Sequence, residues 1–176
     1  PAPRRGGVKG GPRPPRNRRR PRSNLCPVAR DVIRAMKVQL LPSTFNPDGT
    51  ISQRQHLSCL IIDDIVAFDA GSLAFSCSDA HRESVRDVVI THAHLDHIAG
   101  LPIFLDELFA TLTEPVRVHS AAEIVMALER DVFNWSVYPR FSELQNSFGR
   151  VIEYQTFEPR IPFEIAHLTF VPFEVN

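Results

Sequence analysis

Three histidines and an aspartate fall within six residues of this chain: His92, His94, Asp96 and His97, in the string THAHLDHIAG. Residues two apart on an extended chain point the same way, about 6.6 Å apart, so His92 and His94 can bind one ion. Asp96 and His97 follow where the chain turns, and they suit a second ion nearby. Imidazole and carboxylate groups at this density are metal ligands more often than packing groups. The string therefore predicts a metal site.

The expected chemistry of such a site is hydrolysis. Two metal ions roughly 3.5–4 Å apart can share a hydroxide and polarise a phosphoryl or carbonyl oxygen. The competing interpretation is a chance surface cluster or a set of satisfied core histidines. The string directly follows a predicted buried strand at residues 85–91, where open α/β sheets place their ligands. That position favours the metal site.

The elements that must hold this string begin at Met36, with strands first and then helices alternating with strands. The tight turn between two short apolar runs is assigned to Asp63-Asp64 rather than to a pair of acid and base carboxylates. The spacing of Ser120 and Glu123 predicts a capping box at the start of a helix. Strands are expected at residues 38–41, 57–62, 65–68, 85–91, 116–119, 151–154, 163–165 and 168–173, and a helix at 102–112.

The string THAHLDHIAG resembles the HxHxDH signature of the metallo-β-lactamase-fold hydrolases. The resemblance implies an α/β fold, a four-layer αββα sandwich of which roughly the N-terminal half is present. It implies that His92 and His94 bind a first metal, and that Asp96 and His97 bind a second. Asp96 would also handle a proton in catalysis. Asp69, in FDAG, would brace the metal loop rather than bind metal.

Residues 97–106 and parts of 118–141 resemble bacterial relatives of the class II 3′,5′-cyclic-nucleotide phosphodiesterases. The resemblance implies a zinc-dependent phosphodiesterase with two ions in the full-length protein, iron or manganese being alternatives. The substrate would be a cyclic nucleotide or a similar small phosphodiester, attacked by a metal-bound hydroxide. A ribonuclease Z-like nuclease is the next candidate, and a β-lactamase or thioester hydrolase the third, because fold alone does not decide chemistry.

The later ligands of that family, a third histidine, a bridging aspartate and a final histidine, have no counterpart in this chain. The sequence stops at Asn176, after an apolar run where the third histidine would follow. We therefore expect a metallo-β-lactamase-like domain over residues 36–176 that is incomplete at its C-terminus. A protein that truly ended at Asn176 would instead be a non-catalytic metal-binding module.

Charge divides the chain into two segments. Of 20 basic and 20 acidic residues, 11 basic and one acidic lie in residues 1–34. Residues 1–35 are rich in Pro, Gly and Arg and are expected to be a disordered basic tail. The tail could bind nucleic acid. A solvated tail, or sequence upstream of a start at Met36, is favoured because no aromatic residue interleaves the arginines.

Location and partners follow from what the sequence lacks. Its three cysteines are too few for a disulfide framework. No apolar run approaches the ~18 residues of a membrane-spanning helix, and no signal peptide is apparent. We predict a cytoplasmic protein without a membrane segment, whose partner is a small nucleotide phosphodiester. Homodimer formation is left open.

The remaining candidate side chains receive structural interpretations. His119 and His167 adjoin predicted strands and are assigned structural roles, while His56 and His81 lie in polar stretches and are expected to be exposed. Three aromatic residues after the second helix could stack on a nucleobase, although aromatic residues so placed more often pack in a core. These three are Trp135, Tyr138 and Phe141.

Overall fold

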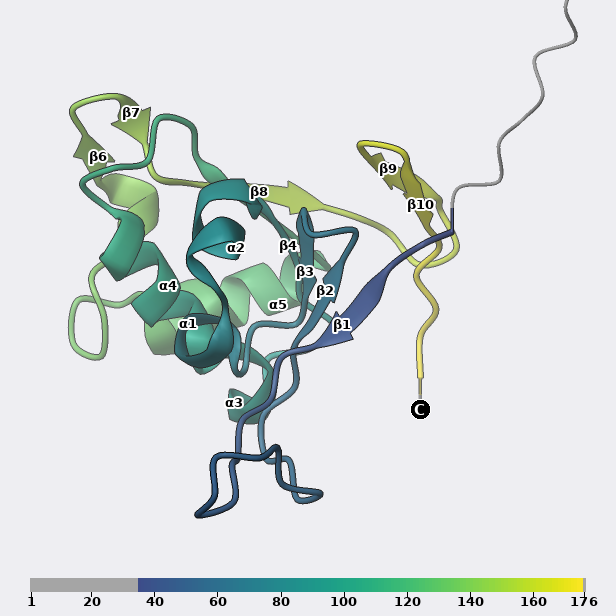
Figure 1. The fold of residues 1–176 in the computed structure, drawn as a ribbon. Coiled ribbons are helices and arrows are strands. Elements are labelled where there is room, and N and C mark those ends of the chain that lie inside the picture. The colour runs from purple at the N-terminus through teal and green to yellow at the C-terminus, as the bar shows by residue number, and fades with distance from the viewer. Residues whose placement is uncertain (1–34, 176) are drawn as a thin grey trace, which may run out of the picture. The chain divides into compact units, whose positions relative to one another are not determined.

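The computed structural model describes residues 35–175 (Figure 1). The described residues belong to one compact unit that begins at Ala35. The basic tail expected over residues 1–35 therefore lies, apart from Ala35, outside the described residues, and so does Asn176.

One main sheet organises the domain, with six strands in the order β1-β2-β3-β4-β5-β8. The pairs β1–β2 and β2–β3 are antiparallel, whereas β3–β4, β4–β5 and β5–β8 are parallel. The six strands are β1 Val38–Leu40, β2 Leu60–Ile62, β3 Val66–Phe68, β4 Asp87–Val89, β5 Val116–Ser120 and β8 Ile152–Thr156. Two small antiparallel sheets are formed by β6 Gln145–Asn146 with β7 Gly149–Arg150, and by β9 Phe163–Ile165 with β10 Leu168–Phe170.

Short helices fill the connections between the strands of the main sheet. The helix expected at residues 102–112 is α4, Gly100–Leu108, which begins two residues and ends four residues earlier than expected. Pro102 lies in its first turn, where its missing N–H costs nothing. The helices are α1 Leu73–Ser76, α2 Asp79–Ser84, α3 Leu95–Ile98, α4 Gly100–Leu108 and α5 Ala122–Ala127, followed by a π-helix at Leu128–Val132 and a 3₁₀-helix at Phe141–Glu143. Strands alternating with helices confirm the α/β class.

Neighbouring residues of the central strands face opposite sides of the main sheet, as the pleat requires. Ile61 and Val88 belong to the larger core, which also contains Phe104 of α4. Ile62 and Val89 belong to a smaller cluster on the other face. Figure 1 shows the helices on one side of the sheet and the β9–β10 hairpin apart from them. The central strands are therefore buried on both faces, which explains why they read as continuous apolar runs.

Aromatic rings fill the smaller cluster. The ring of Phe170 stacks on Phe68 and on Phe163, with centroid distances of 6.5 and 5.4 Å. Phe163 stacks in turn on Phe157, at 5.0 Å. A cavity of about 320 Å³ lies among these four rings, and Thr91 lines part of it. The hairpin thus packs on the sheet through its phenylalanines, directly beside the start of the histidine string.

The turn between β2 and β3 is confirmed at Asp63-Asp64. Both residues have positive φ angles, 48° and 63°, a conformation that aspartate tolerates better than most residues. The capping box predicted at Ser120 is wrong. Ser120 is the last residue of β5, opposite Thr156 in β8, and its hydroxyl donates to the carbonyl of Ile90 at 2.9 Å. The following helix α5 begins after Ala121, without a side-chain cap.

Candidate metal centre

The histidine string follows the carboxyl end of β4, the fourth strand of the main sheet. Residues 90–94 follow the strand without regular secondary structure, and His94, the N-cap of α3, has an extended backbone. Asp96 and His97 lie inside that helix. The predicted change of direction between the two halves of the string is therefore present. The site occupies the edge of the parallel strands where open α/β sheets bind ligands.

The three imidazole rings of the string lie close together. The centroids of His92 and His97 are 3.9 Å apart, and those of His92 and His94 are 4.7 Å apart. The Asp96 side chain is 54% exposed, and its Oδ2 is 3.5 Å from Nε2 of His97. The fold thus brings all four predicted ligands to one edge of the sheet.

A buried aspartate at the end of β3 holds this cluster in place. Oδ1 of Asp69 accepts hydrogen bonds from the backbone N–H and the hydroxyl of Thr91, at 2.9 and 2.8 Å. Oδ2 accepts from Nδ1 of His97 at 2.6 Å. Asp69 is only 3% exposed and has a positive φ of 58°. The carboxylate therefore braces the loop, as the resemblance predicts.

Backbone contacts fasten the same loop to the segment after Asp69. The N–H of Ala70 donates to the carbonyl of His97 at 2.7 Å, and the N–H of Ser58 donates to the carbonyl of Asp96 at 2.8 Å. A Cβ atom at Gly71 would lie 1.9 Å from the Asp96 carbonyl oxygen. Since backbone atoms cannot yield there, only glycine permits α3 to approach this closely. The conformation of the string depends on residues 58–71 as much as on its own sequence.

The surroundings of His92 favour its neutral form. Burial lowers the pKa of His92, and the neighbouring rings of His97 and His94 lower it further. A neutral imidazole keeps one nitrogen lone pair for a metal, whereas an imidazolium has none. The electrostatics of the cluster therefore suit metal binding.

Imidazole nitrogen and carboxylate oxygen are the donors that zinc and similar divalent ions take in proteins, so the chemistry of the residues present fits a metal. Among residues 35–175, however, no group of three or more His, Cys, Asp or Glu side chains is arranged to hold an ion. The four side chains are gathered without being aligned on a common point. Their ligand roles stay predictions.

The other histidines lie away from this cluster. His119 contacts Oδ1 of Asp87 at 2.8 Å, and His167 contacts Oδ2 of Asp63 at 2.6 Å, so both act in packing and pairing. His56 is exposed. The exposure predicted for His81 is wrong: it is 7% exposed.

His81 is buried because α2 packs against the turn between β2 and β3. Its Nε2 lies 3.2 Å from Oδ1 of Asp64. Its Nδ1 has no hydrogen-bond partner among residues 35–175. Local polarity around a histidine therefore did not indicate its burial, which comes from a turn 17 residues earlier.

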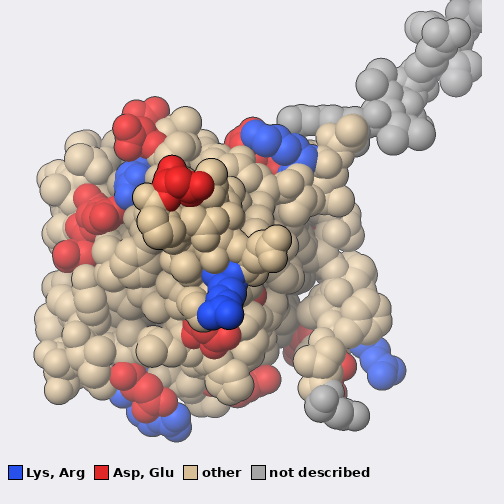
Figure 2. Space-filling view, turned by 60° about the horizontal axis from the view of Figure 1, so that its bottom comes forward, with Lys and Arg blue, Asp and Glu red and all other residues tan. Residues whose placement is uncertain are grey.

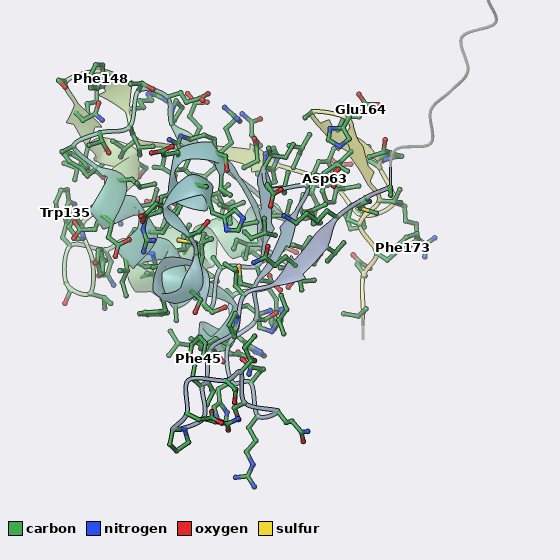
Figure 3. All side chains as sticks on the ribbon, in the orientation of Figure 1. Phe45, Asp63, Trp135, Phe148, Glu164 and Phe173 are labelled. Atoms are coloured by element: carbon green, nitrogen blue, oxygen red, sulfur yellow. The ribbon has the colours of Figure 1, made fainter. Side chains whose placement is uncertain are left out.

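The three aromatic residues after α5 do not share one environment. Phe141 is buried, and Tyr138 packs against the core, as predicted. Core packing is wrong for Trp135, which is 56% exposed and has a positive φ of 68°. Figure 3 shows Trp135 at the margin of the domain, away from the β9–β10 hairpin.

Sequence reasoning missed Thr91, which joins Asp69 to the histidine string. Its hydroxyl oxygen lies 2.8 Å from Oδ1 of Asp69 and 2.9 Å from Nδ1 of His92. The one available signal was its place directly before the first histidine, and that place alone does not reveal a contact with a residue 22 positions earlier.

Comparison with known proteins identifies the family. The sequence pattern of the Metallo-beta-lactamase superfamily matches residues 78–168, just over half of the chain. The chain belongs to this superfamily, as the string THAHLDHIAG predicts. A Yersinia pestis protein described as a probable 3′,5′-cyclic-nucleotide phosphodiesterase is 32% identical over 62 residues, which are 35% of this chain and 17% of that protein.

Solved structures agree on the fold. Unliganded yeast PDE1 is 14% identical, with a TM-score of 0.54 over 75% of this chain and 53% of that one. Zinc-bound PqqB from Methylobacterium extorquens is 16% identical, with a TM-score of 0.53 over 80% of this chain and 56% of that one. The chain therefore spans about half the length of these structures, and a smaller part of the Yersinia protein.

Proposed function

We propose that this chain contributes the first part of the active site of a metal-dependent phosphodiester hydrolase. The observation that carries the proposal is the convergence of His92, His94 and His97 at a strand end, behind which the buried Asp69 orients the loop. Membership of the metallo-beta-lactamase superfamily supports a hydrolytic site. The name of the Yersinia relative supports a cyclic nucleotide or a similar phosphodiester as the substrate.

The proposed ligands are His92, His94, Asp96 and His97, and the proposed metal is zinc, with iron or manganese as alternatives. A divalent ion bound there would lower the pKa of a coordinated water and polarise a phosphoryl oxygen. Two ions are proposed for the full-length protein. The structure of PqqB, which is described as zinc-bound, supports zinc only by analogy of fold.

The residues of the chain itself have three tasks in this proposal. Asp69 keeps the proton of His97 on Nδ1, because its carboxylate can only accept, and so leaves Nε2 for a ligand bond. Asp96, with its carboxylate exposed, is available to take and return a proton during hydrolysis. Gly71 lets the two loops approach closely enough to hold this arrangement.

Charge on the described surface bears on the nuclease alternative. Figure 2 shows basic and acidic side chains scattered singly and in small groups over this face, without a broad basic patch on it. Nucleic-acid binding depends on such patches. This face therefore gives no support to the nuclease alternative, for which the Arg-rich residues 1–34 are the sequence signal.

The decisive experiment measures bound metal and substrate choice together. We expect the purified full-length protein to bind divalent metal and to hydrolyse cyclic AMP in preference to precursor transfer RNA or a cephalosporin. The double variant His92→Ala/His94→Ala should lose both properties, while His56→Ala, a change at an exposed histidine away from the cluster, should keep both. Failure of the intact protein to bind any divalent ion would refute the proposal.

Two other outcomes would replace the phosphodiesterase. Cleavage of precursor transfer RNA that falls when residues 1–35 are removed would favour the nuclease. Hydrolysis of the cephalosporin alone would favour a lactamase. A cytoplasmic location and a homodimer also stay predictions. No helix within residues 35–175 is long and apolar enough to cross a membrane.

A further inference from the structure

We infer that Thr91 is a positioning residue whose hydroxyl fixes which nitrogen of His92 carries the proton. The Thr91 hydroxyl oxygen lies within hydrogen-bond distance of two groups: Oδ1 of Asp69, at 2.8 Å, and Nδ1 of His92, at 2.9 Å. The consequence for metal binding rests on the proposed function. The protonation pattern itself does not.

The pattern follows from counting protons. A threonine hydroxyl has one proton to donate, and an ionised carboxylate can only accept. At 2.8 Å from Asp69, Thr91 must therefore give its proton to the carboxylate. Its oxygen is then left as an acceptor toward His92, so the Nδ1 of His92 must carry a hydrogen. A neutral imidazole with its proton on Nδ1 has a free lone pair on Nε2.

Asp69 fixes the proton position of His97 in the same way, but without an intervening hydroxyl. Oδ2 of Asp69 accepts directly from Nδ1 of His97 at 2.6 Å. One buried carboxylate thus sets two imidazoles whose centroids are 3.9 Å apart. It acts on His97 directly and on His92 through the Thr91 hydroxyl. Both rings are left with Nε2 as the nitrogen available to a metal.

The hydroxyl can be separated from the other contacts of Thr91. The backbone N–H of Thr91 makes its own bond to Asp69 at 2.9 Å, and this bond survives any side-chain change. Thr91 also lines the aromatic cavity beside the sheet. Valine has nearly the shape of threonine and would keep that packing, so Thr91→Val removes the hydroxyl and little else. Thr91→Ser keeps the hydroxyl.

The first measurement uses the metal-free protein. Long-range ¹H–¹⁵N correlation spectra of the histidine rings distinguish a proton on Nδ1 from one on Nε2. We expect the Nδ1–H form of His92 in the wild-type protein and in Thr91→Ser, and its loss in Thr91→Val. A wild-type His92 with its proton on Nε2 would overturn the inference, even if the valine variant failed to fold.

The second measurement is zinc affinity. Loss of a hydrogen-bond partner behind a metal-ligating histidine weakens metal binding by roughly 10–100-fold, and we expect this for Thr91→Val but not for Thr91→Ser. Thr111→Val is the matched control, because its hydroxyl donates to the Leu108 carbonyl at 3.1 Å beyond α4. Wild-type affinity in Thr91→Val would contradict the inference.

The two measurements separate the inference from the proposed function. A wild-type protein that bound no zinc would refute the metal-dependent hydrolase. The ring spectra of that same metal-free protein would still show whether Thr91 sets the tautomer of His92.

Discussion

Aspartates contact histidines at both ends of one strand, β3, and so form two clusters. Asp63 and Asp64 precede it and Asp69 follows it, and all three have positive φ angles. Asp69 contacts Thr91 and His97 of the loop after β4. The two clusters use the same residue types and similar hydrogen bonds, yet only one has the features of a functional site.

The difference lies in where the partners come from. Asp63 binds the backbone N–H of Lys37 and the ring of His167, both at 2.6 Å, and Asp64 binds the Lys37 ammonium and His81. These partners belong to three distant segments, so the turn ties the fold together. Apart from the Ser58 hydroxyl, 3.5 Å from Oδ2, the side-chain partners of Asp69 are Thr91 and His97 of one short string. That string lies at the carboxyl end of parallel strands, where ligands bind. Position in the sheet, rather than residue type, distinguishes the candidate site around Asp69 from the structural turn at Asp63-Asp64.

The largest expected effect comes from Gly71→Ala, because the backbones of Asp96 and Ser58 lie close to Gly71. The added Cβ would lie 1.9 Å from the Asp96 carbonyl oxygen and 2.8 Å from the Ser58 nitrogen. We expect the free energy of unfolding to fall by about 3 kcal/mol or more, because neither backbone can yield. Urea unfolding followed by circular dichroism measures it.

Gly49→Ala is the control for that variant. A Cβ at Gly49 meets no atom within 4 Å, although φ is 82°. It should cost only about 1 kcal/mol, from backbone conformation alone. Equal losses for the two alanine variants would contradict the steric explanation.

Asp69→Asn should produce the next largest effect. Its amide N–H₂ would face a donor, either Thr91 or His97, where the carboxylate now accepts. We expect a loss of about 1–3 kcal/mol in stability, and a zinc affinity weaker by roughly 10–100-fold. Calorimetric titration measures the affinity. Unchanged zinc binding in a folded Asp69→Asn protein would remove the distinction between the two clusters.

Asp63→Asn is the counterpart at the other end of β3. It also places an amide where Lys37 and His167 donate, and it should destabilise the domain by about 1–2 kcal/mol. Zinc affinity should stay at the wild-type value, because the hydrogen bonds of Asp63 to Lys37 and His167 lie outside the histidine string. The same titration and unfolding measurements apply, and a loss of zinc binding here would mean that the clusters are coupled.

A third aspartate–histidine pair predicts a smaller, pH-dependent effect. Burial opposes ionisation of Asp87, but hydrogen bonds from Arg117 and His119 prevail and lower its pKa from 3.8 to about 2. The folded state therefore favours the ionised carboxylate. This stabilisation is present above about pH 4 and is lost as the pH falls toward 2.

Replacement of that group isolates its contribution. Asp87→Asn should be less stable than the wild type by about 1 kcal/mol at pH 7, and the gap should close as the pH falls through the pKa of about 2. Unfolding midpoints recorded along a pH series measure this. A gap of constant size down to pH 2 would show that the charge of Asp87 is not the cause.

Features set by neighbouring residues were predictable from the sequence. The strand before THAHLDHIAG, the turn at Asp63-Asp64 and Pro102 in the first turn of a helix all depend on local patterns, and the structure has each of them. The family followed from one ten-residue string. The predicted ligands were also found at one edge of the sheet, because adjacent residues at a strand end cannot separate far.

Features set by distant residues were not predictable. Ser120 has the local pattern of a helix cap, yet β8 pairs with it and extends the strand through it. His81 lies in a polar stretch, yet the turn at Asp64 covers it. Thr91 looks like an ordinary strand residue until Asp69 is placed beside it. In each case a contact between segments overrides the local pattern, and one sequence without its pairing register does not reveal that contact.

Trp135 affects how the domain can be observed. It is the only tryptophan of the chain, and in the folded domain more than half of its surface already meets water. Its indole emission should therefore stay close to that of a solvated ring whether the sheet is intact or lost. A tryptophan introduced at the buried Phe104 would be the better optical reporter.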